Sequence, residues 1–257
     1  LSSCTQRDEG AKDMAEIHTQ PKTARSVVPQ TLRLSVVIPV YNENATIEEV
    51  LRRVLAVPVE KEVIIVDDGS TDGTRAILER MAQEQPIRLI LQPENRGKGA
   101  AIRTGFGFVT GDVVIIQDAD LEYDPAEYPK LLQPILEDRA DVVYGSRFYY
   151  GRPAGEPWWH YLGNRLLTWI SNRLTGLRLT DMETCYKVLR VEVLRTLSIE
   201  SDRFNVEPEI TAKIARGGWR IVEVPIRYRP RFYSSGKKIG LRDAFEALWT
   251  MFKYRWL

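Results

Sequence analysis

The feature that most constrains the fold is a run of apolar residues that ends in acidic side chains. Val113-Val-Ile-Ile116 are four consecutive β-branched residues, and three acids follow them: Asp118, Asp120 and Glu122. An uninterrupted run of this kind, bounded by turn residues, is typical of a strand buried on both faces of a parallel sheet. Ligands of open α/β sheets bind just beyond the carboxyl ends of such strands. The run therefore predicts an α/β fold with a site at its acidic end.

The three carboxylates are candidate ligands of a divalent metal ion. Carboxylates crowded at one strand end repel one another unless a cation lies between them. Ligand sets made only of oxygen favour Mg²⁺ or Mn²⁺, and Mg²⁺ commonly joins carboxylates to the phosphates of a substrate. The alternative is a surface turn with solvated acids, and Asp118-Ala-Asp120 alone does not decide between the two.

The order of strand, polar turn and helix recurs along the chain. Strands are expected at residues 34–40, 62–67, 87–91, 113–116 and 141–145, with helices between them. Alternating strands and helices predict a mainly parallel sheet with right-handed crossovers. Asn44 is expected to cap the first helix, and Ser70 or Thr71 the second.

Composition limits the function classes. The chain has 257 residues, of which 44% are hydrophobic, so it is long enough to bury a full core. A net charge of +1 with mixed signs gives no indication of nucleic-acid binding. Cys4 and Cys185 provide no disulfide framework, and His18 and His160 argue against a histidine-based site. No apolar run is long enough to span a bilayer.

A glycine-rich turn at residues 95–99 is a candidate phosphate site. Asn95-Arg96-Gly97-Lys98-Gly99 completes neither the dinucleotide-binding motif nor the P-loop motif. It nevertheless offers backbone N–H groups and two cations, Arg96 and Lys98, to a phosphate. The alternative is an ordinary turn that opens a helix.

Five motifs together resemble those of family 2 glycosyltransferases, in the same order. They are Val37-Ile-Pro39-Val-Tyr41-Asn-Glu43, Val66-Asp67-Asp68-Gly-Ser70-Thr-Asp72-Gly-Thr74, Asn95-Arg-Gly97-Lys-Gly99, Asp118-Ala-Asp120-Leu and Gly145-Ser-Arg147. The chain is most similar to the branch that contains dolichyl-phosphate mannose synthase and the dolichyl- or undecaprenyl-phosphate glucose synthases. The resemblance covers about residues 34–240 and implies a GT-A fold, with a mainly parallel central sheet flanked by helices.

The resemblance also implies a site for a nucleotide sugar, either a UDP-hexose or a GDP-hexose. Residues that would line it are Pro39, Tyr41, Glu43, Asp67, Asp68, Arg96, Lys98, Asp118 and Ala119. Asp118 and Asp120 match the family's Asp-x-Asp motif and, with Glu122, would hold Mg²⁺ or Mn²⁺ on the diphosphate. The metal would neutralise the negative charge that grows on the leaving nucleoside diphosphate.

Arginines are expected to hold the acceptor. In the lipid-phosphate synthases that the chain resembles, arginines placed like Arg147 and Arg165 grip the acceptor phosphate, a task suited to bidentate Arg–phosphate contacts. Further cations lie in a segment that parallels the family's Gly-x-Ser-Lys loop: Arg229, Arg231, Lys237 and Lys238. This segment is expected to close over the phosphates as a lid, and the alternative is a basic surface loop.

Asp181 separates two mechanisms. It opens the stretch Asp181-Met-Glu183-Thr-Cys185-Tyr-Lys187, where relatives read Asp-Thr-Gln-Cys-Gly-Phe-Lys, so that Cys185 replaces the usual glycine. A phosphate acceptor is already an anion and needs orientation more than a base. A hydroxyl acceptor would need deprotonation, with Asp181 as the candidate base. The predicted catalytic set is therefore Asp118, Asp120 and Asp181.

Two segments are candidates for contact with a membrane. Residues 158–176 are expected to form an amphipathic helix with Leu162, Leu166, Trp169, Ile170 and Leu174 on one side. Residues 241–257 mix aromatic and basic residues, as interfacial helices do. For each helix the alternative is packing against the core. We expect a flexible extension over residues 1–32, the glycosyltransferase domain over 33–240, and a peripheral position on the cytoplasmic face of the membrane.

Three functional hypotheses follow. The first is inverting, metal-dependent transfer of a hexose, mannose or glucose, from a nucleotide sugar to a polyprenyl or dolichyl phosphate. The second is transfer to a sugar or another hydroxyl acceptor, with Asp181 as base. The third is a nucleotide-sugar-binding subunit without catalytic activity.

Overall fold

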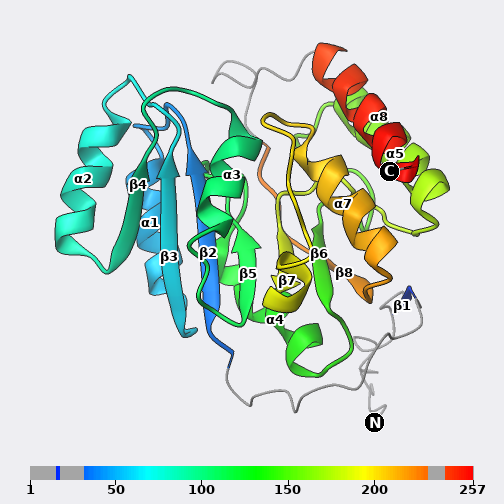
Figure 1. Cartoon of the computed structure of the whole chain (residues 1–257), viewed down its shortest axis with the longest axis horizontal. Helices are drawn as coiled ribbons and strands as arrows, with labels where there is room; N and C mark the ends of the chain where they lie inside the picture. Colours follow the sequence, from blue (N-terminus) through cyan, green and yellow to red (C-terminus); the bar gives the residue numbers. More distant parts are fainter. Residues whose placement is uncertain (1–15, 18–31, 231–240, 257) are drawn as a thin grey trace, which may run out of the picture.

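The central element of the fold is a mixed sheet with helices on both of its faces (Figure 1). The structure is a computed structural model that describes residues 16–17, 32–230 and 241–256. Within these residues the sheet has eight strands in the order β1-β8-β6-β7-β5-β2-β3-β4. The strands are β1 (Glu16–Ile17), β2 (Leu34–Val40), β3 (Lys61–Asp67), β4 (Ile87–Leu91), β5 (Val113–Ile116), β6 (Val142–Ser146), β7 (Lys187–Arg190) and β8 (Ile221–Pro225).

The first half of the chain forms the parallel part of the sheet. β5, β2, β3 and β4 are consecutive parallel neighbours, with Val37 opposite Ile64 and Ile116. Every residue of β2 and β5 is buried, as the unbroken apolar runs require of strands covered on both faces. β7 is antiparallel to both β5 and β6, and β6 is parallel to β8. The predicted mainly parallel α/β sheet is confirmed.

Helices connect the strands and cover the sheet. They are α1 (Ile47–Ala56), α2 (Thr74–Glu84), α3 (Lys98–Phe106), the short 3₁₀ helix η1 (Pro125–Glu127), α4 (Tyr128–Leu136), α5 (Trp158–Thr175), α6 (Val191–Leu194), α7 (Val206–Gly217) and α8 (Leu241–Trp256). α3 packs against β2 and β3, whereas α4 packs against β6, β7 and β8. In Figure 1, α3 lies in front of the sheet and α1 behind it.

Helices α5 and α8 lie side by side at one end of the molecule (Figure 1). α5 buries a polar stripe of three residues, Asn164, Thr168 and Ser171. The predicted apolar stripe is divided, because Leu162, Leu166 and Trp169 are 53–57% exposed whereas Ile170 and Leu174 pack against the core. α8 buries Ala247, Met251 and Tyr254 and exposes Phe245, Trp249 and Phe252. Each helix therefore packs on one side and presents an apolar face to the outside on the other.

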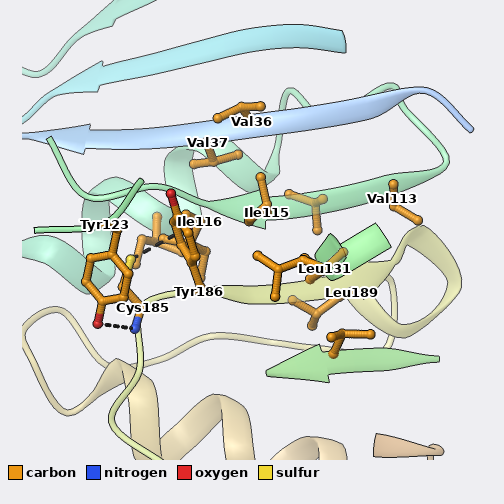
Figure 2. Close-up of a cluster of buried hydrophobic side chains, with 14 of the residues drawn as sticks. Val36, Val37, Val113, Ile115, Ile116, Tyr123, Leu131, Cys185, Tyr186 and Leu189 are labelled. Carbon is orange, nitrogen blue, oxygen red and sulfur yellow. Dashed lines mark hydrogen bonds between the residues drawn. The ribbon is translucent and has the colours of Figure 1, made fainter. Parts of the chain in front are cut away.

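The core between the two halves of the sheet contains the cysteine that replaces the family glycine. Cys185 is buried just before β7, and its backbone N–H donates to the Tyr123 hydroxyl at 3.1 Å (Figure 2). Its Sγ lies 3.6 Å from the Ile116 carbonyl oxygen at the end of β5. Tyr186 packs on Tyr123 with ring centroids 4.7 Å apart. The larger side chain at this position thus fills core space beside the acidic strand end.

Two local predictions were wrong. α1 begins at Ile47 after Thr46, and the Asn44 side chain donates instead to the Asp72 carbonyl oxygen at 2.8 Å. α2 is preceded by Gly73, whose φ of 96° favours glycine, and neither Ser70 nor Thr71 caps it. The helix N-terminus is covered by Asp72, which accepts from the Thr74 backbone N–H at 3.0 Å. Asn44 therefore joins two turns instead of capping α1, whereas the cap of α2 is local but comes from Asp72.

The proposed domain boundaries remain predictions. Most of residues 1–32 lie outside the described residues, although Glu16–Ile17 pair with β8 as an edge strand. The lid segment at 231–240 also lies outside them. Within the part of the chain that the structure describes, no helix combines the length and apolar character needed to cross a bilayer.

Candidate active site

Most of the predicted donor residues lie at the ends of three neighbouring strands, and Arg96 and Lys98 lie where α3 begins. β5, β2 and β3 are parallel, so their carboxyl ends meet at one edge of the sheet. The turns after them are joined through Thr46, whose hydroxyl contacts the Glu43 carboxylate at 2.8 Å and the Ala119 carbonyl oxygen at 3.0 Å. The sheet topology therefore brings the motif after β2 and the Asp-x-Asp motif after β5 together.

Two of the predicted donor-site acids hold the loops in place. Asp67 is fully buried and forms a 2.7 Å ion pair with Arg75. Asp68 accepts hydrogen bonds from the backbone N–H groups of Arg96 and Gly97, at 2.9 and 2.8 Å. Burial raises the pKa of Asp68, although these two hydrogen bonds favour its charged form. Asp68 thus fixes the glycine-rich turn against the end of β3.

The residues after β2 differ in their availability. Pro39 is buried within the strand, opposite Val66. Tyr41 is 45% exposed, so part of its side chain is accessible to a planar group such as a nucleobase. Glu43 is half-buried, and Arg96 in the glycine-rich turn is exposed. Tyr41 and Arg96 are therefore more accessible than Pro39, Asp67 or Asp68.

A chain of alternating charges leads from the Asp-x-Asp motif into the protein. Lys98 Nζ lies 2.8 Å from Asp118 and 3.2 Å from Glu207 at the start of α7. Glu207 also contacts the fully buried Lys187 at 2.5 Å. Burial disfavours the charge on Lys98, but Asp118 and Glu207 outweigh this effect and raise the pKa of Lys98 well above its ordinary value. Lys98 therefore stays protonated beside the predicted metal ligand.

The other two predicted metal ligands have neighbours of their own. Asp120 accepts from the Glu122 backbone N–H at 3.1 Å. Glu122 is buried, and its carboxylate accepts from the Tyr228 hydroxyl at 2.9 Å. No group of three His, Cys, Asp or Glu side chains placed to hold a metal ion occurs among the described residues. Asp118 and Asp120 are nevertheless half-buried oxygen donors, and Mg²⁺ is often held by one or two carboxylates together with substrate phosphates. The pair fits such a role.

The predicted acceptor arginine forms a buried bidentate ion pair with Asp181. Arg147 Nε and Nη2 each lie 2.7 Å from an Asp181 carboxylate oxygen, and the Arg147 backbone N–H adds a third bond at 3.0 Å. Asp181 is 0% exposed and Arg147 is 9% exposed. The two residues predicted for different roles, phosphate binding and base catalysis, are therefore partners of each other.

A cavity of about 200 Å³ opens beside Arg147. It is lined by residues of β6, of the segment that follows β6, and of the end of β8, among them Arg147, Tyr149, Arg152 and Tyr228. The Arg147 guanidinium lies over the Tyr228 ring, 5.3 Å from its centroid. Arg165 is not among the cavity residues and lies on the exposed side of α5. The structure thus pairs Arg147 with Arg152 at this cavity rather than with Arg165.

Of the four remaining predicted cations, the structure describes only Arg229. Arg231, Lys237 and Lys238 lie outside the described residues. Arg229 is exposed, and its backbone N–H donates to the Glu122 carbonyl oxygen at 3.0 Å. The segment that leads into the predicted lid is therefore anchored next to the Asp-x-Asp motif.

Sequence reasoning missed several charged residues that surround the site. Glu207, Lys187 and Glu223 were not among the candidates, although Lys187 lies in the stretch compared with the family. Both carboxylate oxygens of Glu223 accept from the Thr180 N–H at 2.8–2.9 Å, and Oε1 also accepts from Asp181. Burial raises the pKa of Glu223 to about 7 against these bonds. A single acid inside an otherwise apolar strand, Ile221-Val-Glu223-Val-Pro225, was the available signal.

Cys185 shows no sign of thiol reactivity. It is buried, and burial is the largest cause that raises the pKa of its thiol well above the ordinary value, with the Asp118 charge acting in the same direction. A thiol that stays protonated is a poor nucleophile.

A mixed, mainly parallel sheet with acids at adjacent parallel strand ends is the arrangement expected of a GT-A fold. The chain belongs to glycosyl transferase family 2, whose model matches residues 35–198. This confirms the resemblance drawn from the five motifs.

The chain is similar to curated relatives in sequence and to a solved structure in fold. It is 32% identical over 220 residues to an undecaprenyl-phosphate mannosyltransferase of Micrococcus luteus, covering 81% of this chain and 88% of the relative. It is 31% identical to an undecaprenyl-phosphate 4-deoxy-4-formamido-L-arabinose transferase of Edwardsiella ictaluri, covering 79% of this chain but only 62% of that protein's length. A glucosyl-3-phosphoglycerate synthase from Mycobacterium tuberculosis, solved with Mn²⁺, UDP and glucosyl-3-phosphoglycerate, shares the fold with a TM-score of 0.68 at 22% identity, covering 88% of this chain and 81% of that one.

Proposed function

We propose that this chain transfers a hexose from a nucleotide sugar to a polyprenyl phosphate, with inversion at the anomeric carbon. The relatives at 31–32% identity are named for transfer to undecaprenyl phosphate. One of them is a mannosyltransferase, so mannose is the first sugar to test. The acceptor phosphate oxygen forms the new bond to the anomeric carbon as the bond to the nucleoside diphosphate breaks.

The observation that carries the proposal is a cationic cavity tied to an apolar surface. Arg147 and Arg152 line the cavity, which is polar enough to receive a phosphate. Phe148, next to Arg147, packs on Tyr161 of α5 with ring centroids 5.2 Å apart. The same helix exposes Leu162, Leu166 and Trp169. A phosphate head group in the cavity would thus be followed by a surface suited to its hydrocarbon chain.

The chain's own residues supply binding and orientation. Asp181 uses the Nε and Nη2 donors of Arg147 and leaves the Nη1 donors for the acceptor phosphate. Lys98 is placed to contact the donor diphosphate as well as Asp118. Mg²⁺ or Mn²⁺ held by Asp118 and Asp120 would stabilise the negative charge of the leaving nucleoside diphosphate. The α5 and α8 faces would hold the enzyme at the membrane surface, on the cytoplasmic side where nucleotide sugars are expected.

Transfer to a hydroxyl acceptor is the second hypothesis, and the contacts of Asp181 argue against it. A general base must lie within hydrogen-bond reach of the hydroxyl that it deprotonates. Asp181 is fully buried and accepts three hydrogen bonds from Arg147. A subunit that only binds nucleotide sugars is the third hypothesis, and the intact Asp-x-Asp motif weighs against it.

The test is transfer of labelled sugar to a short polyprenyl phosphate. UDP-glucose and GDP-mannose are supplied in parallel, with Mn²⁺, with Mg²⁺ and with a chelator. We expect labelled lipid from one donor, loss of product with the chelator, and at least about 100-fold lower turnover for Asp120→Asn, which corresponds to about 3 kcal/mol of transition-state stabilisation.

The matched control is Asp112→Asn. Asp112 immediately precedes β5, at the opposite end from Asp120, and accepts from the Arg33 backbone N–H at 2.8 Å, a bond that an amide oxygen retains. Its turnover should equal that of the unaltered protein. Full activity of Asp120→Asn, or labelled product only with sugar acceptors, would overturn the proposal.

A further inference from the structure

Glu183 is an acidic side chain with an unsatisfied buried oxygen. It lies in the loop between α5 and β7, two residues after Asp181, and the residue as a whole is half-buried. Its Oε1 atom is shielded from solvent and has no hydrogen-bond partner among the residues that the structure describes. A buried polar atom without a partner is unfavourable by roughly 1–3 kcal/mol, and native proteins keep few of them. Such an atom in a substrate-binding region points to a ligand.

The loop around Glu183 is held firmly on both sides. Asp181 is fixed by Arg147 and, through its backbone N–H, by Glu223. Thr184 donates its hydroxyl to the Gly145 carbonyl oxygen at 2.6 Å. A loose loop therefore does not explain why the Glu183 Oε1 atom lacks a partner. Its backbone position is set by its neighbours.

The carboxylate of Glu183 interacts with two groups of charges. Lys187 and Glu207 belong to the chain that continues to Lys98 and Asp118, on the donor side. Arg147 and Asp181 form the pair beside the acceptor cavity. Glu183 is thus coupled to the residues proposed for the donor diphosphate and to those proposed for the acceptor phosphate.

We infer that Glu183 binds a hydroxyl group of the hexose that is transferred, and so takes part in selecting the sugar. This inference rests on the proposed function, because it assigns the sugar to the space between the donor and acceptor residues. A sugar that passes from one phosphate to the other must occupy that space.

The surrounding charges exclude the other common partners of a carboxylate. The nearest cations are already paired, Lys187 with Glu207 and Arg147 with Asp181. A phosphate oxygen would be repelled by the charged form of the side chain. A hydroxyl group can donate to the carboxylate or accept from the carboxylic acid, so it satisfies Oε1 in either protonation state. Burial raises the pKa of Glu183 to about 7, so both states are populated near neutral pH.

The experiment measures donor binding by calorimetry without any acceptor. The full chain is titrated with UDP-glucose and GDP-mannose, with UDP and GDP, and with the 2-, 3-, 4- and 6-deoxy analogues of whichever sugar nucleotide binds. Glu183→Leu removes the hydrogen-bonding group, and Glu183→Gln keeps its shape and a hydrogen-bonding oxygen. We expect Glu183→Leu to bind the sugar nucleotide at least tenfold more weakly, with the affinity for UDP or GDP changed less than twofold.

Coupling to one hydroxyl is the decisive result. One deoxy analogue should bind the unaltered protein and Glu183→Leu equally, because the interacting hydroxyl is already absent. Glu183→Gln should retain most of the affinity and show that the loop is intact. If every deoxy analogue is weakened by the same factor in both proteins, or if UDP and GDP lose as much as the sugar nucleotides, the inference is wrong.

The two proposals fail in different ways. Coupling to one hydroxyl, together with no transfer to polyprenyl phosphate, would keep Glu183 as a sugar-binding residue and overturn the proposed acceptor. Transfer to the lipid without such coupling would keep the proposed function and overturn the role of Glu183. Binding of neither donor would overturn both.

Discussion

Two ion pairs in the site differ in how far they are withdrawn from water. The Arg147–Asp181 pair is bidentate, with side chains 6% and 0% exposed. The Lys98–Asp118 pair has a single 2.8 Å contact, with side chains 17% and 22% exposed. Both lie where a substrate phosphate is proposed to bind, yet only the second leaves both charges partly accessible.

This difference in exposure indicates which residues mainly stabilise the fold and which can contact a ligand. Removing one partner of a buried pair leaves an uncompensated charge in a poorly solvated place. A partly hydrated pair can exchange one partner for a phosphate or a metal ion at little cost, because water compensates the change. Arg147 therefore has a structural role as well as its proposed role toward the acceptor, whereas the role proposed for Lys98 is mainly to bind ligand.

The largest expected effect compares the two pairs directly. Arg147→Met should destabilise the protein by about 3–5 kcal/mol, because Asp181 stays buried without its cation. Lys98→Met, which replaces a side chain of similar length, should lower the free energy of unfolding by about 1–2 kcal/mol, because Asp118 stays partly hydrated and Glu207 keeps its contact with Lys187. Urea unfolding at neutral pH measures both. Equal losses would show that the two pairs do not differ as described.

A double variant checks the cause of the larger effect. Arg147→Met combined with Asp181→Asn removes both charges, and the amide oxygen still accepts from the backbone N–H at position 147. The double variant should recover more than half of the stability lost by Arg147→Met. A double variant that is no more stable than Arg147→Met would attribute the loss to packing against Phe148 and Tyr228 instead.

The same contrast separates what the sequence predicted from what it did not. The fold and the meeting of the motifs at one sheet edge were predictable, because unbroken apolar runs followed by polar turns define parallel strands and the place where they end. The motifs also identified Asp118 and Asp120. Their local sequence did not reveal that Lys98 contacts Asp118, since that contact depends on how α3 packs against the sheet.

The acceptor side was less predictable because its contacts join distant segments. Asp181 and Arg147 are 34 positions apart, and the residues around each of them do not predict a bidentate ion pair. The burial of a polar stripe on α5 was also hidden, because periodicity identifies a stripe of Leu162, Leu166 and Trp169 without saying which side faces the core. Glu183 carried no signal at all, since an unpartnered atom is defined only by its surroundings.

The next effect concerns Glu183, whose Oε1 atom is buried without a hydrogen-bond partner among the described residues, unlike the paired carboxylate of Asp181. The pKa of Glu183 is raised from 4.5 to about 7, so the folded protein binds a proton more tightly than the unfolded chain does. Stability must then fall as pH rises through this range. Glu183→Gln has no charge to bury and should be more stable than the unaltered protein by about 1–3 kcal/mol at pH 8, with little difference at pH 4.

Urea unfolding at pH 4, 6 and 8 measures this effect. Glu223, whose pKa is also raised to about 7, contributes a decrease of the same sign, and that part should persist in Glu183→Gln. Glu48→Gln serves as the control, because Glu48 forms an exposed ion pair with Arg80 and should leave the pH dependence almost unchanged. A Glu183→Gln protein with the unaltered pH dependence would show that Glu183 already has a partner.

The smallest effect on stability is expected at the exposed apolar faces of α5 and α8, where side chains contribute little to the fold. Trp169 on α5 is 56% exposed and Trp249 on α8 is 72% exposed, so replacing both by Ser should change the free energy of unfolding by less than about 0.5 kcal/mol. The same double variant should bind vesicles of phosphatidylglycerol and phosphatidylcholine about tenfold more weakly, because each indole contributes apolar area at the interface.

Met251→Ala is the matched inward change on α8, since Met251 is 2% exposed, and it should destabilise the protein by about 2–5 kcal/mol. If the folded Met251→Ala protein keeps its vesicle affinity while the tryptophan variant loses it, the outer face alone binds the membrane. Unchanged vesicle binding by the tryptophan variant would remove these helices from the proposed membrane contact.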